Sequence, residues 1–346
     1  MAFSRLIHHT IGQETTAYYV GYSWRQLHEL VPADRTVLLI DEHVAQLHQQ
    51  LCVPWPTVII PSGEASKSWD RMHNLIDELC RLQVDRSWFL VGVGGGVVTD
   101  LVGFLAAIYM RGLSFGFVPT TLLAQVDASI GGKNGIDFGK YKNLIGTIRQ
   151  PAFVVIDSAL LQTLPQQEWQ NGFAEIIKYA CIADRDLFDF LETHREQALQ
   201  GEAETLFHVV LTSLQHKLHI VATDPYEKGV RRFLNFGHTL GHAIEKVIEI
   251  PHGQAISVGM RVACQLSQKL SGLTPTESER IQRLLQAYGL PTTLPDIDWN
   301  EVWDCLHHDK KREKDILHFI LLETIGRARM EPIPIQQLEQ LLPVYW

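Results

Sequence analysis

Five short apolar runs, separated by amphipathic stretches, constrain the fold of this chain most strongly. The runs are TVLLI from residue 36, TVII from 57, WFLVGV from 88, SFGFVP from 114 and AFVVID from 152. Continuous apolar runs of this length are typical of parallel strands that are buried on both faces. The sequence therefore predicts an α/β domain in which helical segments alternate with the strands of a parallel sheet.

The pattern changes after Pro165. Runs rich in β-branched residues become rare, and helical periodicity dominates from Trp169 through the segment RIQRLLQAYGL, which starts at Arg280. A length of 346 residues suits two domains of ordinary size. We therefore expect an α/β domain over residues 1–165 and a mainly α-helical domain over residues 166–346.

The net charge and the N-terminal sequence limit the partners and the cellular compartment that we expect for this chain. The formal net charge is -9, whereas nucleic acid and anionic membranes select an excess of Lys and Arg, so we expect neither as a partner. The first residues, MAFSRLIHH, lack the basic-then-apolar order of a signal peptide, and no apolar stretch reaches the ~18 residues of a membrane span. Five cysteines without a C-x-x-C pair indicate neither a disulfide framework nor a zinc ribbon. The sequence predicts a cytoplasmic protein.

A glycine turn follows the third apolar run. In WFLVGVGGGVVTD the strand ends at Gly94–Gly96, and a helical segment that contains Asp100 follows. Such a turn lets backbone N–H groups approach a phosphate at the N-terminus of a helix; the alternative is a tight turn without a ligand. Val97 stands where the usual fingerprint has a third glycine, so we expect a Rossmann-like variant of the dinucleotide fold. The polar loop PSGEASK could add ribose contacts through Glu64 and Lys67.

The segment NFGHTLGHAIE points to a metal site. His238 and His242 stand four residues apart in a helical context, so both rings project from one face. A catalytic divalent metal typically has three protein ligands and an open position, and Glu175 and His252 are the candidates for a further ligand. The alternatives are two unrelated histidines and a structural ion pair between Glu175 and Lys178. That pair is plausible because two charges on one apolar helix face are costly to bury without partners.

The segment DASIGGKNGIDFGKYKN, residues 127–143, is rich in lysine and glycine. It holds Lys133, Lys140 and Lys142 among four glycines. A solvated charged face is the usual explanation of such lysines. Flexible backbone and ammonium groups together favour anion binding at Lys133 and Lys142.

Together and in this order, these segments resemble the 3-dehydroquinate synthase family. The resemblance runs from about residue 36 to residue 325, and its specific stretches are PSGEASK, GGGVVTD, MRG, VPTTLLAQVDASIGGK, KNLIG, AEIIKY, GVRRFLNFGHTLGHAIE, PHGQA and DKK. The chain departs from the family pattern at Asn134-Gly135, where the family commonly has Thr-Ala. It also departs at Gln254, where Glu is common, and at Asp224-Pro225, where Asp-Glu is common.

The resemblance implies a cofactor set and roles for individual residues. The cofactors would be NAD and one divalent metal ion, zinc or cobalt, in a homodimer. Metal ligation would fall to Glu175, His238 and His252. Catalysis would use His242, as a proton-transfer residue rather than a ligand, with Lys133, Lys178 and Asn143. Dinucleotide contacts would come from Asp41, Glu64, Lys67, Gly94, Gly95, Gly96, Asp100, Thr120, Thr121, Lys133, Lys142 and Thr163. Substrate contacts would come from Asp127, Lys133, Lys142, Asn143, Lys178, Lys217, Arg231, Asn235, His242 and Lys310, and from Arg111 across a dimer interface.

The implied activity is that of a carbon-oxygen lyase of the shikimate pathway, which supplies aromatic amino-acid biosynthesis. It would convert 3-deoxy-D-arabino-heptulosonate 7-phosphate, a phosphorylated sugar acid, to 3-dehydroquinate and phosphate. Transient oxidation by NAD would acidify a C–H bond so that phosphate can leave; re-reduction, ring opening and aldol closure would follow.

Two other activities remain as alternatives: a related cyclase acting on sedoheptulose 7-phosphate, and a metal-dependent polyol dehydrogenase. The residues expected to pair with a substrate carboxylate are all present, namely Lys217, Arg231, Asn235 and Lys310. Their presence favours the heptulosonate over sedoheptulose 7-phosphate. The lysine-rich glycine segment disfavours the dehydrogenase, which would not need it.

Overall fold

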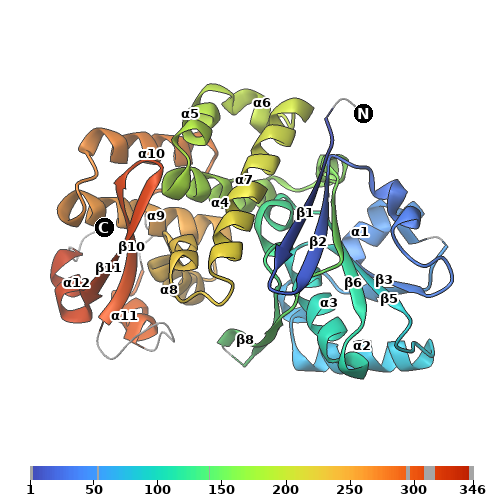
Figure 1. The fold of residues 1–346 in the computed structure, drawn as a ribbon. Coiled ribbons are helices and arrows are strands. Elements are labelled where there is room, and N and C mark those ends of the chain that lie inside the picture. The colour runs from blue at the N-terminus through green and yellow to red at the C-terminus, as the bar shows by residue number, and fades with distance from the viewer. Residues whose placement is uncertain (1–2, 53, 140, 294–296, 308–315, 343–346) are drawn as a thin grey trace. The chain divides into compact units, whose positions relative to one another are not determined.

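The computed structural model describes residues 3–52, 54–139, 141–293, 297–307 and 316–342 (Figure 1). The chain divides into two compact units: unit 1 is Met1–Pro165 with Leu206–Pro225, and unit 2 is Gln166–Thr205 with Tyr226–Trp346. The sequence analysis placed residues 206–225 in the second domain, whereas here they pack with the first unit. Helical periodicity shows that a helix has an apolar face, but it does not show which core receives that face.

Unit 1 is built on a seven-stranded sheet with the order β1-β2-β9-β6-β5-β3-β4 (Figure 1). The predicted runs form its parallel strands β3 (Thr36–Asp41), β4 (Thr57–Ile60), β5 (Phe89–Gly94), β6 (Ser114–Pro119) and β9 (Phe153–Ile156). Strands β3, β5, β6 and β9 are almost wholly buried, as continuous apolar runs require. The predicted α/β fold class is confirmed.

Two strands before the predicted series complete this sheet. β1 (Arg5–Ile11) and β2 (Glu14–Val20) form an antiparallel hairpin, and β2 pairs in parallel with β9. Much of this hairpin is exposed or half-buried, and polar residues interrupt the apolar ones except in the last four residues of β2, AYYV. The hairpin was therefore not predicted.

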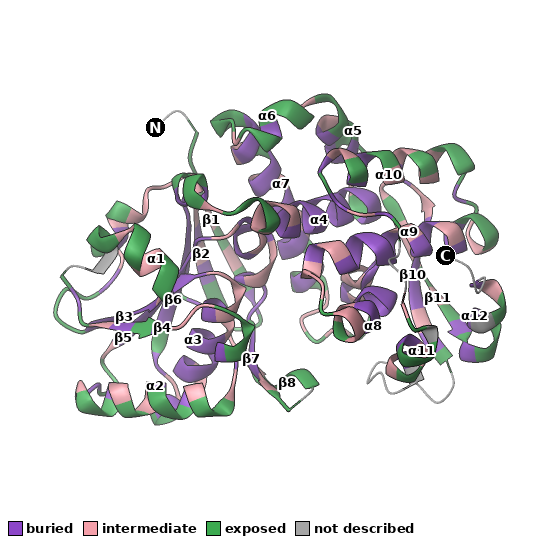
Figure 2. Ribbon diagram, turned by 180° about the vertical axis from the view of Figure 1, so that it is seen from behind, coloured by how far each residue is buried: buried purple, intermediate pink, exposed green. Residues whose placement is uncertain are grey.

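The helices of unit 1 differ in how far they are buried. α3 (Gly96–Ile108) is buried over most of its length, whereas α2 (Trp69–Arg81) buries one apolar stripe and exposes its other face (Figure 2). α1 (Glu42–Leu47) follows β3, and α7 (Ala203–Thr223) lies mostly within the returning segment. Short helical turns complete the unit: η1 (Trp24–Glu29), η2 (Gln49–Cys52), η3 (Glu64–Ser66), η4 (Tyr109–Arg111), η5 (Ala124–Ala128) and η6 (Ser158–Thr163).

The lysine-rich segment forms a separate antiparallel hairpin, β7 (Lys133–Phe138) and β8 (Tyr141–Ile148), and not an open loop. β7 packs against α3, where Gly103 leaves the necessary room. A Cβ atom added at Gly103 would lie 1.9 Å from Oδ1 of Asn134. The Asn134 amide is buried and donates to the carbonyls of Gly132 (2.7 Å) and Arg149 (3.0 Å). Asn134, one of the departures from the family pattern, therefore anchors the hairpin.

Unit 2 is mainly helical, as predicted. Its elements are α4 (Gln166–Ala183), α5 (Arg185–Thr193), α6 (Arg195–Leu199), η7 (Val230–Asn235), α8 (His238–Ile248), α9 (His252–Leu270), α10 (Pro275–Ala287), α11 (Trp299–His307), β10 (Ile316–Thr324), β11 (Arg327–Pro334) and α12 (Ile335–Leu341). Apolar side chains from α8, α9, α11, α12 and the antiparallel β10–β11 hairpin form one core. No helix in the part of the chain that the structure describes is both long and apolar enough to cross a membrane.

Candidate metal centre and dinucleotide edge

Close packing of α8 on α9 brings two histidines of unit 2 together. A Cβ atom added at Gly259 would lie 1.9 Å from the carbonyl oxygen of Gly237, so only glycine permits this approach. His238 is the first residue of α8, and His252 is the first residue of α9. The glycine contact brings α8 and α9 close together, and the ring centroids of His238 and His252 are 5.6 Å apart.

Glu175, from the middle of α4, completes the group. Its Oε1 atom lies 3.4 Å from Nε2 of His238 and 3.4 Å from Nε2 of His252. The carboxylate is fully buried, and Oε1 has no hydrogen-bond partner among the described residues. Tetrahedral zinc ligands that stand ~2.0–2.1 Å from the ion lie about 3.3–3.4 Å from one another. The donor atoms and their separation therefore fit one divalent metal ion.

The partners of the outer ring nitrogens fix the orientation of both histidine rings. Nδ1 of His238 lies 3.1 Å from the carbonyl oxygen of Phe236, and because a carbonyl can only accept, Nδ1 carries the proton. Nδ1 of His252 lies 3.5 Å from Oε2 of Glu245. Each ring is thus oriented from its outer side, which leaves Nε2 facing Glu175.

Lys178 forms the ion pair that the sequence analysis considered as the alternative for Glu175. Its ammonium group donates to Oε2 of Glu175, and both side chains are buried. The two interpretations are therefore compatible in this structure, because Oε2 serves the ion pair while Oε1 faces the imidazoles.

The charges of this group follow from burial and its neighbours. Burial alone would raise the pKa of Glu175, but the Lys178 ammonium holds that pKa well below its usual value, so the carboxylate is ionised. Burial lowers the pKa of His238 despite the nearby carboxylate, which keeps this ring neutral. For His252, burial is outweighed by the nearby carboxylates of Glu175 and Glu245, which raise its pKa to about 9 in the metal-free chain.

His242 lies beside the group without joining it. Its ring centroid is 5.0 Å from that of His238 and 6.1 Å from that of His252. The atoms that cluster with Glu175 within 4.8 Å come from His238 and His252. His242 instead clusters with Glu245 and His252, a set that the sequence analysis missed, although Glu245 follows His238 by seven residues and so shares its helix face.

In unit 1, two of the predicted dinucleotide residues, Asp41 and Gly94, lie at the carboxyl edge of the sheet. The chain order reverses between β3 and β5, which are neighbours, whereas β4 lies beyond β3 and β6 lies beyond β5. Such a reversal is where α/β sheets bind ligands. Asp41 ends β3 and Gly94 ends β5, and a Cβ atom added at Gly94 would lie 3.2 Å from Cβ of Asp41. Asp41 therefore lies at the switch point although it precedes the glycine turn by about 50 residues.

The glycine turn serves packing and also leaves helix N–H groups uncapped. A Cβ atom added at Gly94 would lie 2.6 Å from Cγ2 of Val98, and one at Gly95 would lie 3.0 Å from Cγ2 of Thr121. No side chain caps the N-terminus of α3, which begins at Gly96. Its first N–H groups suit a phosphate, whose charge the helix dipole favours.

Polar side chains surround this turn. The ammonium of Lys67 lies 2.6 Å from Asp100 Oδ2 and 3.9 Å from Glu64 Oε1, and although burial opposes it, these carboxylates raise the pKa of Lys67. Oδ1 of Asp41 accepts from Ser62 Oγ at 2.7 Å and also caps α1. Thr120 and Thr121 follow β6, and Thr163 lies in η6 with its hydroxyl 3.4 Å from a ring nitrogen of His48.

The predicted substrate residues occupy several places. In unit 1, Lys217 donates to the carbonyl of Asp127 (2.5 Å) and to its Oδ1 (2.7 Å). Asn143 has a φ of 50° and donates its N–H to Asp137 Oδ1 at 2.7 Å. The remaining predicted residues lie as follows: Arg111 in η4 with a φ of 66°, Arg231 buried in η7, Asn235 with its amide 2.7 Å from Glu227 Oε1, and Lys310 outside the described residues.

The hairpin register separates Lys133 from Lys142. Lys133 stands opposite Ile148 and Phe138 stands opposite Tyr141, so the two lysines lie towards opposite ends of the hairpin. At ~3.3 Å per residue, the distance along the strands is about 13 Å. The register therefore places the two lysines apart along the hairpin, and anion binding at each of them stays a prediction.

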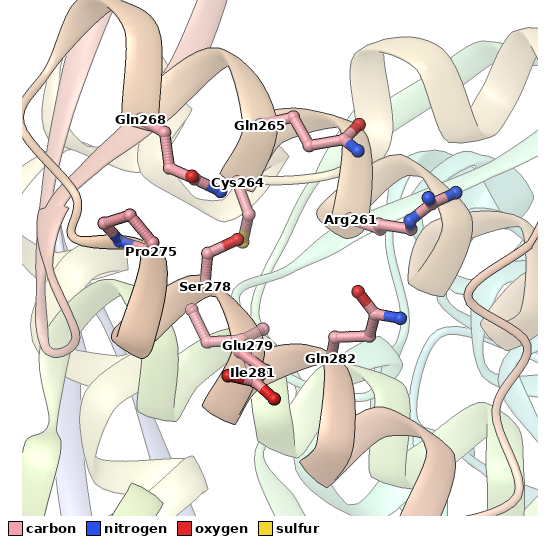
Figure 3. Close-up of a pocket in the computed structure, with 9 residues that line it drawn as sticks. All are labelled: Arg261, Cys264, Gln265, Gln268, Pro275, Ser278, Glu279, Ile281 and Gln282. Carbon is pink, nitrogen blue, oxygen red and sulfur yellow. The ribbon is translucent and has the colours of Figure 1, made fainter. Parts of the chain in front are cut away.

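A separate cavity of ≈ 170 Å³ lies between α9 and α10 of unit 2 (Figure 3). Arg261 and Gln265 of α9 line one side, and Ser278 and Gln282 of α10 line the other. Of the predicted site residues that the structure describes, none lines this cavity.

Two family models match consecutive parts of the chain: the N-terminal 3-dehydroquinate synthase model over residues 57–171 and the C-terminal one over residues 172–312. A 3-dehydroquinate synthase of Symbiobacterium thermophilum is 39% identical over 340 residues, which cover 93% of this chain and 95% of that relative.

Two solved structures share the fold over nearly the whole chain. A 2-epi-5-epi-valiolone synthase from Streptomyces hygroscopicus, with NAD+ and Zn2+ bound, has a TM-score of 0.88 at 26% identity and covers 96% of this chain and 97% of that chain. A 2-deoxy-scyllo-inosose synthase complexed with carbaglucose-6-phosphate, NAD+ and Co2+ has a TM-score of 0.86 at 25% identity and covers 97% of this chain and 99% of that chain.

Proposed function

This chain belongs to the 3-dehydroquinate synthase family, and we propose on that basis that it converts 3-deoxy-D-arabino-heptulosonate 7-phosphate to 3-dehydroquinate and phosphate. The observation that carries the proposal is the buried group of Glu175, His238 and His252, whose donor atoms fit one divalent ion. The cofactors are NAD and one zinc or cobalt ion, as in the two solved relatives.

The chain's own residues prepare the chemistry of these cofactors. When bound, NAD would supply reversible hydride transfer, and the metal ion, held by Glu175, His238 and His252, would supply Lewis-acid chemistry at the substrate oxygen on C5. Lys178 keeps Glu175 ionised, so that the carboxylate is ready to bind a cation. His242, beside the ligands but outside their group, is the base that we assign to the C5 hydroxyl proton.

The residues assigned to the substrate carboxylate support the heptulosonate over sedoheptulose 7-phosphate. Arg231 is 3% exposed, and a buried guanidinium is well suited to a carboxylate. In unit 1, Lys217 is held by two oxygens of Asp127. A guanidinium can pair with a carboxylate through two parallel hydrogen bonds, which sedoheptulose 7-phosphate cannot offer because it has no carboxylate.

A substrate comparison tests this assignment. The chain, supplied with NAD and zinc, should turn over the heptulosonate and leave sedoheptulose 7-phosphate unchanged, as followed by mass spectrometry of the products. Arg231→Met should raise KM for the heptulosonate, whereas Arg232→Met, a neighbour that is only half-buried, should change it little. Cyclisation of sedoheptulose 7-phosphate alone would assign the chain to the alternative cyclase.

We also propose that the chain forms a homodimer. Four apolar side chains of the β7–β8 hairpin are between 42% and 56% exposed: Phe138, Tyr141, Leu144 and Ile148. Apolar groups gathered on one exposed hairpin are typical of an interface. Light scattering after size exclusion should give twice the mass of one chain, and Leu144→Asp should lower it; a monomeric wild-type chain would contradict the proposal.

We further assign the chain to the cytoplasm. The cysteines whose side chains the structure describes, Cys80, Cys181, Cys264 and Cys305, are free thiols. Unpaired thiols are typical of a reducing compartment. Cell fractionation would test the assignment, and recovery from an oxidising compartment would contradict it.

A further inference from the structure

Glu245 stands on the outer side of a metal-binding histidine. Its Oε2 atom lies 3.5 Å from Nδ1 of His252, while Nε2 of the same ring lies 3.4 Å from Glu175. The Glu245 side chain is only 11% exposed. It reaches this position because it follows His238 by seven residues and therefore lies on the same face of α8, two turns further along.

We propose that Glu245 is a positioning residue for the metal centre: its carboxylate accepts the Nδ1 proton of His252 and so holds Nε2 towards the ion. The inference rests on the proposed function, since it assumes that Glu175, His238 and His252 bind a metal. Carboxylates behind ligand histidines fix the tautomer and the ring plane, and their loss typically weakens metal binding 10- to 100-fold.

The two ligand histidines of α8 and α9 are oriented in the same way, which supports this role. His238 directs Nδ1 to the carbonyl of Phe236, and His252 directs Nδ1 to Glu245. In both cases an acceptor stands behind the ring while Nε2 faces Glu175. The backbone supplies the acceptor for His238, whereas a side chain from α8 supplies it for His252.

A competing interpretation treats Glu245 as a metal ligand itself. One ring nitrogen each of His242 and His252 and a carboxylate oxygen of Glu245 lie within 4.8 Å of one another. A metal ion there, together with the first, would require His252 to bind through both nitrogens, which removes both ring protons. The positioning role requires one ion and one neutral imidazole, which is the ordinary state of a ligand histidine.

Zinc affinity separates these interpretations. The dissociation constant for zinc alone, without NAD or substrate, is measured by competition with a chromophoric chelator, and bound zinc is counted by elemental analysis. Glu245→Ala should raise this constant about 10- to 100-fold at unchanged stoichiometry of one ion per chain. Glu245→Gln should have a smaller effect, because its amide oxygen still accepts a hydrogen bond. The matched control Glu249→Gln removes an exposed carboxylate from the end of α8 and should leave the constant unchanged.

The outcomes discriminate between the proposals. Circular dichroism establishes that each variant is folded. If Glu245→Ala does not fold, the positioning role is tested by Glu245→Gln, whose dissociation constant for zinc should also exceed that of the wild type. Wild-type affinity in both folded variants would overturn the positioning role and leave the proposed function intact. Two zinc ions in the wild-type chain and one in Glu245→Ala would also overturn it, by making Glu245 a ligand of a second site. A wild-type chain that binds no zinc would contradict the proposed function as well.

Discussion

The buried pair of Glu175 and Lys178 allows metal binding to be separated from stability. Replacing Glu175 by Gln leaves the Lys178 ammonium, which is 2% exposed, opposite a neutral amide inside unit 2. Removing one partner of a buried ion pair costs ~3–5 kcal/mol, because the remaining charge is left uncompensated. The amide oxygen of Gln can still accept one hydrogen bond, so we expect the free energy of unfolding to fall by about 3 kcal/mol.

A second replacement, at Lys178, removes the uncompensated ammonium charge. Uncharged side chains in place of a buried ion pair are often neutral or stabilising, so Glu175→Gln combined with Lys178→Met should regain most of the lost stability. It should not regain zinc, because the anionic ligand that faces His238 and His252 is gone. Stability and metal binding should thus separate in the double variant.

Urea unfolding in metal-free buffer, followed by circular dichroism, gives the free energies, and elemental analysis gives the zinc content. Zinc at wild-type stoichiometry in the double variant would mean that Glu175 serves only the ion pair. A single variant Glu175→Gln as stable as the wild type would refute the argument from buried charge.

Three further predictions follow from single positions. His242→Ala should keep one zinc ion per chain while turnover falls about 10²-fold or more, the scale of lost acid–base catalysis; loss of the zinc would make His242 a ligand. The pKa of His252 is raised from 6.5 to about 9, so its protonation stabilises the metal-free chain fully below about pH 6.5, and this stabilisation is lost as pH rises through about 9. The melting temperature of the metal-free chain should fall over this pH range, and His252→Gln should abolish that fall. Gly103→Ala should cost about 1–3 kcal/mol in urea unfolding, and less on an Asn134→Ala background, because the added Cβ would meet that amide; equal costs on both backgrounds would contradict this.

Four of the five strands that the sequence predicted are almost wholly buried. β3, β5, β6 and β9 are continuously apolar, so each is visible as a run, whereas the edge strand β4 is only partly buried. In the β1–β2 hairpin, which is largely exposed or half-buried, polar residues interrupt the apolar ones over most of the length. β10 is apolar, but it follows a long helical region, and periodicity alone does not distinguish a short apolar run in a strand from one in a helix.

The site was predictable in its residue types and only partly in its geometry. A four-residue spacing identified His238 and His242 as neighbours, yet the group around Glu175 contains His252 instead, because α8 and α9 cross at Gly237 and Gly259. That crossing depends on packing between helices, which spacing within one helix does not reveal. The family resemblance supplied this ligand set, and the structure shows that its donor atoms lie together.

Lys133 and Lys142 are a case in which the structure holds two predicted site residues apart. Their glycine-rich composition suggested a flexible backbone around both ammonium groups, whereas the backbone pairs as two strands of a hairpin. Residues at different positions along a hairpin are separated by the rise of the strand, so Lys133 and Lys142 lie towards opposite ends of it. The two lysines are therefore held apart by regular hydrogen bonding that composition did not predict.

The central claim is that NAD acts as a catalyst within one turnover and phosphate is eliminated. It is tested most directly by recording phosphate release and NADH absorbance together while the zinc-loaded chain and NAD act on 3-deoxy-D-arabino-heptulosonate 7-phosphate. We expect one phosphate released for each substrate consumed, with no lasting NADH absorbance, since the hydride returns before the product leaves. Steady accumulation of NADH with a simple polyol, and no phosphate released from the heptulosonate, would show instead that the chain is a metal-dependent dehydrogenase.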